Sequence, residues 1–152
     1  MLRIRDIDHL VLRVVDPAAM IRFYCGVLGC TIERQRDDLG LIQLRAGRSL
    51  IDLVAVDGAL GRAGGHAPAR DGRNLDHFCL RVEPFDESAI RERLAAAGVP
   101  AGETAVRYGA EGNGPSIYVN DPEGNTIELK GPPAMAREVA TPSRPSLLEG
   151  EP

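Results

Sequence analysis

Two histidines occupy matching positions in a segment that the chain repeats. Residues 8–14 (Asp-His-Leu-Val-Leu-Arg-Val) return as residues 76–82 (Asp-His-Phe-Cys-Leu-Arg-Val), with five of the seven residues identical. His9 and His77 are therefore equivalent. Neutral imidazole is the commonest nitrogen ligand for divalent transition metals in proteins. A matched pair of histidines favours a metal site, although solvated strand residues preserved after a duplication would give the same pattern.

Two carboxylates are predicted to share a face with these histidines. Side chains alternate between the two faces of a β-strand. On that basis Asp52 and Glu128 lie opposite the apolar side chains of their strands, as His9 and His77 do. Two imidazoles with one or two carboxylates suit Zn, Ni, Mn, Co or Fe(II). Three protein ligands would leave positions open for water and substrate, which a catalytic site needs.

Each half of the chain predicts one helix after its histidine strand. Asp16 is a good N-cap and Pro17 suits the first helical position. An apolar stripe with helical spacing follows and ends at a glycine: Met20, Phe23, Tyr24, Val27, Leu28 and then Gly29. The second half repeats this order, with a capping residue, a stripe and a closing glycine: Asp86, then Ile90, Leu94 and Ala97, then Gly98.

Strands close each half, which gives the pattern β-α-β-β-β twice. Apolar runs and turn signals predict these strands: residues 30–35, 39–45 and 49–56, then 104–108, 116–120 and 126–130. The fold class is therefore α+β, built from two tandem modules. The predicted domain spans residues 1–131, with modules at 4–57 and 74–131.

Three segments fall outside the modular pattern. Residues 58–74 are rich in Gly, Ala and Arg and read as a linker or mobile loop, in which His66 is either solvated or a catalytic group or ligand. Residues 109–116 contain three glycines and are predicted to form a mobile loop or lid at the mouth of a cavity. Residues 132–152 are predicted to be an extended or disordered tail.

The bulk composition excludes several classes of function. A formal charge of −4 and a pI near 5.4 argue against nucleic acid as a partner. No apolar run reaches the length needed to span a bilayer. The first residues are charged where a secretory signal would be apolar, so a cytoplasmic location is expected.

Five motifs together resemble the vicinal-oxygen-chelate superfamily, the glyoxalase/bleomycin-resistance/dioxygenase group. They are Asp8-His9, Phe23-Tyr24, Val27-Leu28-Gly29, Asp76-His77 and the closing run from Asp121 to Leu129 (Asp-Pro-Glu-Gly-Asn-Thr-Ile-Glu-Leu). The resemblance covers about residues 4–131. It implies a cupped mixed sheet of two modules around a metal, with helices on the outer face, often in a homodimer.

The resemblance also implies which residues bind the ion. His9, His77 and Glu128 correspond to the family's ligands. Asp52 stands where glyoxalase I has a fourth ligand, a glutamate. Because aspartate is one methylene shorter, Asp52 is a ligand, a general base or neither.

Four further residues are candidates for substrate binding. Arg13 and Arg73 lie where glyoxalase I enzymes use such groups on glutathione carboxylates, and Arg81 is the repeat of Arg13. Surface or salt-bridge roles are the alternative for all three. Val56 replaces the family's amide side chain, which argues against glutathione. Tyr118 either points inward to the site or packs in the core.

The leading hypothesis is a metal-dependent lyase or isomerase acting on a small oxygenated substrate. The ion would bind two adjacent substrate oxygens and stabilise an enediolate, with Glu128 or Asp52 moving the proton. The alternatives are an Fe(II) extradiol-type dioxygenase, a thiol transferase of the fosfomycin-resistance type, and a non-catalytic ligand-binding protein of the bleomycin-resistance type. The sequence alone does not choose the metal or the substrate.

Overall fold

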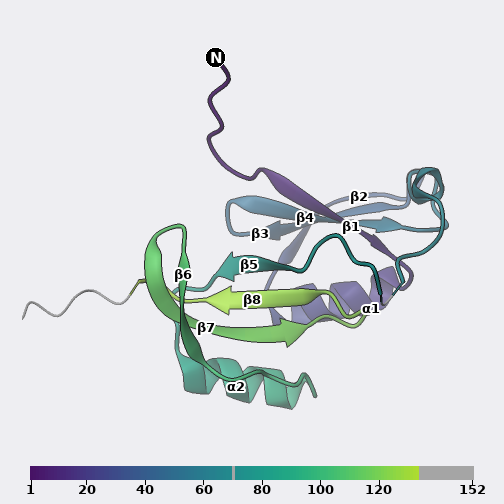
Figure 1. The fold of residues 1–152 in the computed structure, drawn as a ribbon. Coiled ribbons are helices and arrows are strands. Elements are labelled where there is room, and N and C mark those ends of the chain that lie inside the picture. The colour runs from purple at the N-terminus through teal and green to yellow at the C-terminus, as the bar shows by residue number, and fades with distance from the viewer. Residues whose placement is uncertain (70, 134–152) are drawn as a thin grey trace, which may run out of the picture.

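The computed structural model describes residues 1–69 and 71–133, and it contains two modules of the same build (Figure 1). Module 1 consists of β1 (His9–Val14), α1 (Pro17–Ile21), a π-helix (Arg22–Val27), β2 (Thr31–Arg36), β3 (Leu41–Ala46) and β4 (Ser49–Ala55). Module 2 consists of β5 (His77–Arg81), α2 (Glu87–Ala96), β6 (Ala105–Gly109), β7 (Gly112–Asn120) and β8 (Thr126–Lys130). The predicted tail lies outside the described residues from residue 134 onward.

Each module folds its four strands into a sheet of its own. The strand orders are β1-β4-β3-β2 and β5-β8-β7-β6. In both sheets the histidine strand is an edge strand that pairs in parallel with the last strand of its module, and the other pairings are antiparallel. The predicted α+β class with tandem modules is confirmed, with the eight strands divided between two sheets rather than joined in one.

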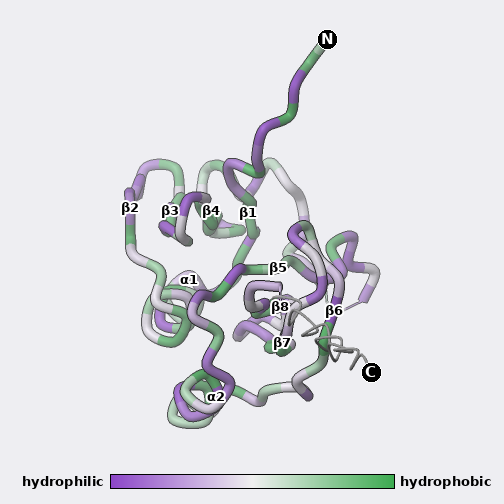
Figure 2. Tube along the Cα trace, turned by 90° about the vertical axis from the view of Figure 1, so that its left-hand side faces the viewer, coloured by the Kyte–Doolittle hydropathy of each residue, from purple (hydrophilic) through white to green (hydrophobic). Residues whose placement is uncertain are grey.

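Both helices begin as the sequence predicts. The Asp16 carboxylate accepts a hydrogen bond from the Ala19 N–H at 2.9 Å, and the Asp86 carboxylate accepts one from Ala89 at 3.1 Å. The first helix changes to π geometry after Ile21, a change that the regular apolar spacing did not predict. In both views α1 lies below the strands of module 1 and α2 below those of module 2 (Figures 1 and 2).

One apolar core joins the two modules. Leu12, Val14 and Leu53 of module 1 belong to the same buried cluster as Ile127 and Leu129 of module 2. Inside this core the fully buried Tyr24 donates its hydroxyl hydrogen to Asp121 Oδ2 at 2.9 Å. Burial and the Asp121 carboxylate raise the pKa of Tyr24, so its hydroxyl keeps its proton and remains a donor.

The prediction of a mobile loop over residues 109–116 is wrong. These residues form the tight end of the β6–β7 hairpin, and β7 already begins at Gly112. The glycines serve close packing: a Cβ at Gly109 would lie 2.6 Å from Lys130 Cε, and one at Gly114 would lie 2.6 Å from the Pro132 carbonyl oxygen. Glycine permits this close approach, and the resemblance to a flexible loop is one of composition only.

The segment between the modules is partly ordered by module 1. It contains a short 3₁₀ helix (Gly61–Gly64). Within residues 1–69 and 71–133, no helix is both long and apolar enough to cross a membrane.

Candidate metal centre

The start of β5 brings an imidazole next to a buried carboxylate. His77 Nδ1 lies 2.7 Å from Asp76 Oδ2, and His77 Nε2 lies 3.6 Å from Glu128 Oε2 on the neighbouring strand β8. The Tyr118 ring on β7 meets the imidazole edge-on, with the ring centroids 5.3 Å apart. Three adjacent strands therefore converge on His77.

Glu128 has one carboxylate oxygen that no described residue satisfies. Glu128 is only 6% exposed, and its Oε1 is buried without a hydrogen-bond partner among the described groups. A buried, unpaired carboxylate oxygen is costly, because the charge has lost its water and gained nothing in return. A cation bound at Oε1 would remove that cost, so this atom fits the role of a metal ligand.

Module 1 repeats the arrangement with Asp52 in place of glutamate. His9 Nδ1 lies 2.8 Å from Asp8 Oδ1. This hydrogen bond is the main cause that raises the pKa of His9, and the nearby Asp52 carboxylate adds to it. Asp52 is also 6% exposed; its Oδ2 accepts a hydrogen bond from Gln43 Nε2 at 3.0 Å, while its Oδ1 is buried without a described partner.

Asp8 and Asp76 contact the Nδ1 atoms of His9 and His77, an arrangement that the sequence analysis did not predict. A carboxylate that holds the Nδ1 hydrogen of an imidazole leaves the Nε2 lone pair free for a metal, and it makes that nitrogen more basic. The sequence does indicate this contact, because an aspartate directly precedes each of the two repeated histidines. Gln43, which orients Asp52, had no such signal because no equivalent glutamine exists in the second half.

The two histidine–carboxylate pairs remain separate within one chain. Among the described residues, no group of three His, Cys, Asp or Glu side chains is close enough to hold a metal ion. The structure brings His77 to Glu128, but it does not bring His9 to them. We call His9 with Asp52 the first half-site and His77 with Glu128 the second half-site. The imidazole and carboxylate donors of each half-site are of the types that suit a divalent ion.

The three predicted substrate-binding arginines all have protein partners. Arg13 donates to the carbonyl oxygens of Gly61 (3.0 Å), Gly65 (2.7 Å) and His66 (3.0 Å), and so ties down the segment between the modules. Arg73 donates to Asn125 Oδ1 and the Glu123 carbonyl oxygen, both at 2.7 Å. Arg81 pairs with Glu111 of the β6–β7 hairpin at 2.7 Å. His66 itself is exposed in the arrangement that Arg13 holds.

Cys79 lies beside Glu128 on the face of the second half-site. The two residues are paired in register across β5 and β8. Desolvation of the thiol, with a contribution from the Glu128 carboxylate, raises the pKa of Cys79 to about 11. The thiol is therefore protonated near neutral pH and is a poor nucleophile there.

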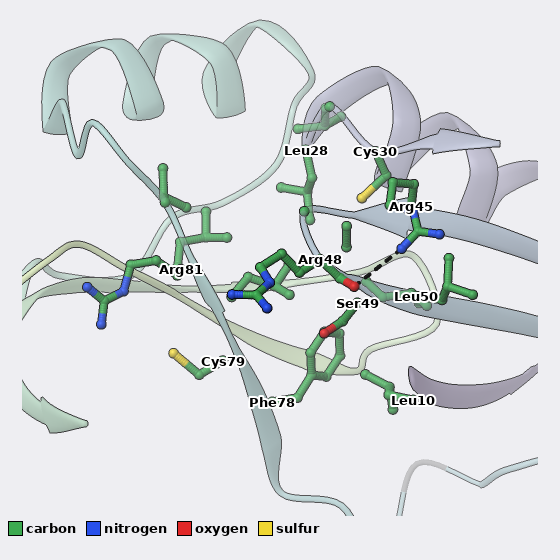
Figure 3. A pocket seen from close by; sticks show the side chains of 18 of the residues that line it. Leu10, Leu28, Cys30, Arg45, Arg48, Ser49, Leu50, Phe78, Cys79 and Arg81 are labelled. Carbon is green, nitrogen blue, oxygen red and sulfur yellow. Dashed lines mark hydrogen bonds between the residues drawn. The ribbon is translucent and has the colours of Figure 1, made fainter. Parts of the chain in front are cut away.

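A cavity of about 1030 Å³ opens between the modules next to β5 (Figure 3). Its walls come from the β3–β4 turn, the end of the π-helix, β5 and α2. The lining is mostly apolar, with His77, Cys79 and Arg81 from β5 and with Arg45 and Arg48 from the β3–β4 hairpin. Figure 3 shows Arg48 between Arg81 on one side and Arg45 on the other. The cavity is large enough for a small molecule, and it touches the histidine–carboxylate pair at His77, which lines it, whereas Glu128 does not.

The duplicated fold with its paired histidines agrees with the comparisons to known proteins. A model of the Glyoxalase/Bleomycin resistance protein/Dioxygenase superfamily matches residues 6–129. The chain belongs to this superfamily. A structure from the mobile metagenome of V. pseudocholerae, VPC_CASS1, is 30% identical, with a TM-score of 0.69 over 86% of this chain and 97% of that chain.

Two more distant structures share the fold. The lactoylglutathione lyase from Agrobacterium tumefaciens is 21% identical, with a TM-score of 0.58 over 83% of this chain and 92% of that one. The antibiotic-binding protein TnmS3 from Streptomyces sp. CB03234 is 20% identical, with a TM-score of 0.62 over 87% of this chain and 98% of that one. The superfamily fold thus carries both a lyase and a binding protein.

Proposed function

We propose that this chain is a divalent-metal-dependent lyase or isomerase that acts on a small oxygenated substrate. The observation that carries the proposal is the buried, unpartnered Oε1 of Glu128 next to His77. A bound cation would stabilise a buried carboxylate oxygen in that state. The same combination of an aspartate-held imidazole and a buried carboxylate in module 1 supports the proposal, because both modules keep it although neighbouring positions such as Val54 and Lys130 differ.

The ligands we propose are His9, His77 and Glu128. A bound divalent cation would polarise adjacent substrate oxygens and make a neighbouring C–H group more acidic. Asp8 and Asp76 fix the orientation of the two imidazoles. Asp52 is the better placed of the carboxylates to move a proton, because Gln43 holds its Oδ2 while its Oδ1 stays free.

We further propose that two chains complete the site in a homodimer. Each chain offers both half-sites on separate sheets, and no three donors meet among the described residues. Both histidine strands, β1 and β5, are sheet edges, where unpaired backbone groups are available to another chain. Joining the first half-site of one chain to the second half-site of another would bring together the three proposed ligands, His9 from one chain and His77 with Glu128 from the other.

Metal analysis of two variants and of their mixture tests this arrangement. Elemental analysis of purified protein should find a divalent ion, and His9→Ala and His77→Ala should each lose it. If the two variants are co-expressed with different tags and the mixed dimer is purified, one intact site should return, with half the metal content of the original protein. Metal retained in both single variants would overturn the ligand assignment. Loss without recovery in the mixed dimer would overturn the sharing between chains.

The identity of the metal and a substrate assay separate the chemistries. Zinc, nickel, cobalt or manganese supports lyase or thiol-transferase chemistry, whereas iron supports ring-cleaving oxygenation. Turnover of the hemithioacetal of glutathione by metal-loaded protein would identify a glyoxalase I activity. Its absence would exclude the glyoxalase I activity, in line with Val56 in place of an amide side chain.

The cavity between the modules favours a second candidate function, ligand sequestration. Its volume of about 1030 Å³ and mostly apolar lining suit the binding of a small molecule without chemistry. A bulky replacement at Leu80, such as Leu80→Trp, would fill part of the cavity from β5. Sequestration predicts loss of ligand binding in this variant and unchanged binding in Glu128→Gln, because Glu128 does not line the cavity. Metal-dependent catalysis predicts a requirement for Glu128.

A further inference from the structure

The two modules differ in charge at the residue that stands two positions after the buried carboxylate, Asp52 in module 1 and Glu128 in module 2. Lys130 follows Glu128 on the same face of β8 and pairs with Ser116 on β7. The equivalent pair in module 1 is Val54 with Leu41. The two modules share the same strand pairing at this place. The Lys130 cation and the Ser116 hydroxyl therefore distinguish module 2 from module 1.

Lys130 is a buried cation with only neutral partners among the described groups. Lys130 is 3% exposed, and its ammonium donates hydrogen bonds to the carbonyl oxygens of Arg107 and Gly114. No ion pair of Lys130 occurs within the described residues. Burial of a cation costs free energy unless an anion compensates it. The positive electrostatic potential around the Lys130 ammonium therefore favours a negative charge nearby.

Arg107 brings a second positive charge to the same place. Its Nη1 donates to Ser116 Oγ at 2.9 Å and to the Ser116 carbonyl oxygen at 3.1 Å. Its guanidinium lies 4.4 Å from the centroid of the Tyr118 ring. These contacts fix the plane of the guanidinium, and they leave Nε and Nη2 without an acceptor in the described part of the chain. A planar fork of two N–H groups is suited to an oxyanion.

Tyr118 connects this charge to the second half-site. One ring contacts both Arg107 and the imidazole of His77. Its hydroxyl has no hydrogen-bond partner among the described residues, so it is available as a donor. A short substrate could therefore reach from the His77–Glu128 pair to the Arg107 fork along a single aromatic side chain.

We propose that Arg107, with Tyr118 and the charge of Lys130, forms an oxyanion subsite, and that the substrate carries a carboxylate, phosphate or phosphonate group. As a substrate subsite it rests on the proposed function, but the affinity for an anion does not require the metal. The oxyanion accepts hydrogen bonds from Arg107 and from the Tyr118 hydroxyl. Lys130 raises the local positive potential without direct contact.

Anion titrations of the metal-free full chain test the proposal. Inorganic phosphate and sodium acetate are added separately to ¹⁵N-labelled protein, and dissociation constants are taken from amide shifts on β6 and β7. Arg107→Gln should weaken binding of the preferred anion by about tenfold or more, as expected for a lost charge-assisted contact. Lys130→Met should weaken it severalfold, because the local positive potential falls although no contact is lost. Arg36→Gln is the matched control, since Arg36 lies opposite Leu41 on the edge strand of module 1 and should leave binding unchanged.

The outcomes separate this subsite from the metal proposal. Stronger binding of phosphate identifies a phosphate-type substrate group, and stronger binding of acetate identifies a carboxylate. No shift with either anion, or equal affinity in the original protein and a folded Arg107→Gln or Lys130→Met variant, overturns the subsite even if His77→Ala loses its metal. If His77→Ala keeps its metal while Arg107→Gln still loses anion binding, the subsite stands and the metal assignment fails. Arg107→Lys provides a second test should the glutamine variant not fold, because it keeps the charge but loses the fork.

Discussion

Modules 1 and 2 share their donors and differ in what surrounds them. Each presents a histidine held by the preceding aspartate and a buried carboxylate with one oxygen that has no partner in residues 1–69 and 71–133. Around Asp52 the neighbours are Gln43, Val54 and Leu41, whereas around Glu128 they are Tyr118, Lys130 and Ser116. The shared groups suit an ion that both modules contact. The unshared groups suit a substrate that contacts one module more than the other.

The carboxylates provide the sharpest way to break this comparison. We expect Glu128→Gln to weaken metal binding by about a hundredfold or more, and Asp52→Asn to weaken it by less than about tenfold. The reason is that Glu128 lies beside its histidine with a free oxygen, while Asp52 is shorter and already engaged by Gln43. Competition with a fluorescent chelator measures both affinities. Equal losses would show that the two half-sites contribute alike.

The aspartates that hold the imidazoles test what the modules have in common. Asp8→Asn and Asp76→Asn should each lower metal affinity by about 10–100-fold, as is typical for a group that orients a histidine ligand. Neither change removes a ligand, so both variants should still saturate at the original stoichiometry. Isothermal titration calorimetry gives both quantities. A large effect at Asp76 with none at Asp8 would show that His9 is not a ligand.

The equivalent arginines test the difference in structural role. Arg13→Ala should lower the free energy of unfolding by about 1–2 kcal/mol, because three carbonyl oxygens lose a charged donor. The substitution also removes Arg13 Nε, a buried donor that has no described hydrogen-bond partner. Removing this unsatisfied donor offsets part of the loss. Arg81→Ala removes only a partly exposed ion pair with Glu111, and its cost should stay below about 1 kcal/mol. Urea denaturation compares the two, and equal costs would contradict the assignment.

The hydrogen bond from the Tyr24 hydroxyl to Asp121 joins the two modules. Tyr24→Phe should cost about 1 kcal/mol, since Asp121 keeps its hydrogen bonds from Glu123 and Asn125. Tyr118→Phe is the control, because the Tyr118 hydroxyl has no partner in the described ranges, and its cost should be near zero. Thermal unfolding of both variants checks this. A cost of several kcal/mol at Tyr24 would mean that the modules separate when the bond is lost.

Local rules accounted for most of the fold. The repeat around the two histidines, the alternation along β1 and β8, and the caps at Asp16 and Asp86 each depend on a few neighbouring residues, so they could be predicted from the sequence. The same alternation predicted that Asp52 and Glu128 lie on the faces of the histidines, and the register of their strands agrees.

Non-local contacts could not be predicted in this way. The Gly-rich end of the β6–β7 hairpin resembles a loop in composition, and only the closeness of Lys130 explains Gly109. The carbonyl partners of Arg13 come from residues about fifty positions later, and Arg107 gains its significance from Tyr118 and Lys130 on other strands. The division of the strands into two sheets likewise depends on packing between modules, for which periodicity provides no signal.

The repeated half-site has a consequence for the ancestry of the chain. A protein made of one such module would hold one imidazole and one carboxylate, too few ligands for a stable centre. Two copies related by a twofold axis would supply two of each, arranged symmetrically around one ion. Fusion of the two copies into one gene would free each half to change independently. Val54 and Lys130, at equivalent positions, illustrate how far such divergence can proceed once symmetry no longer constrains it.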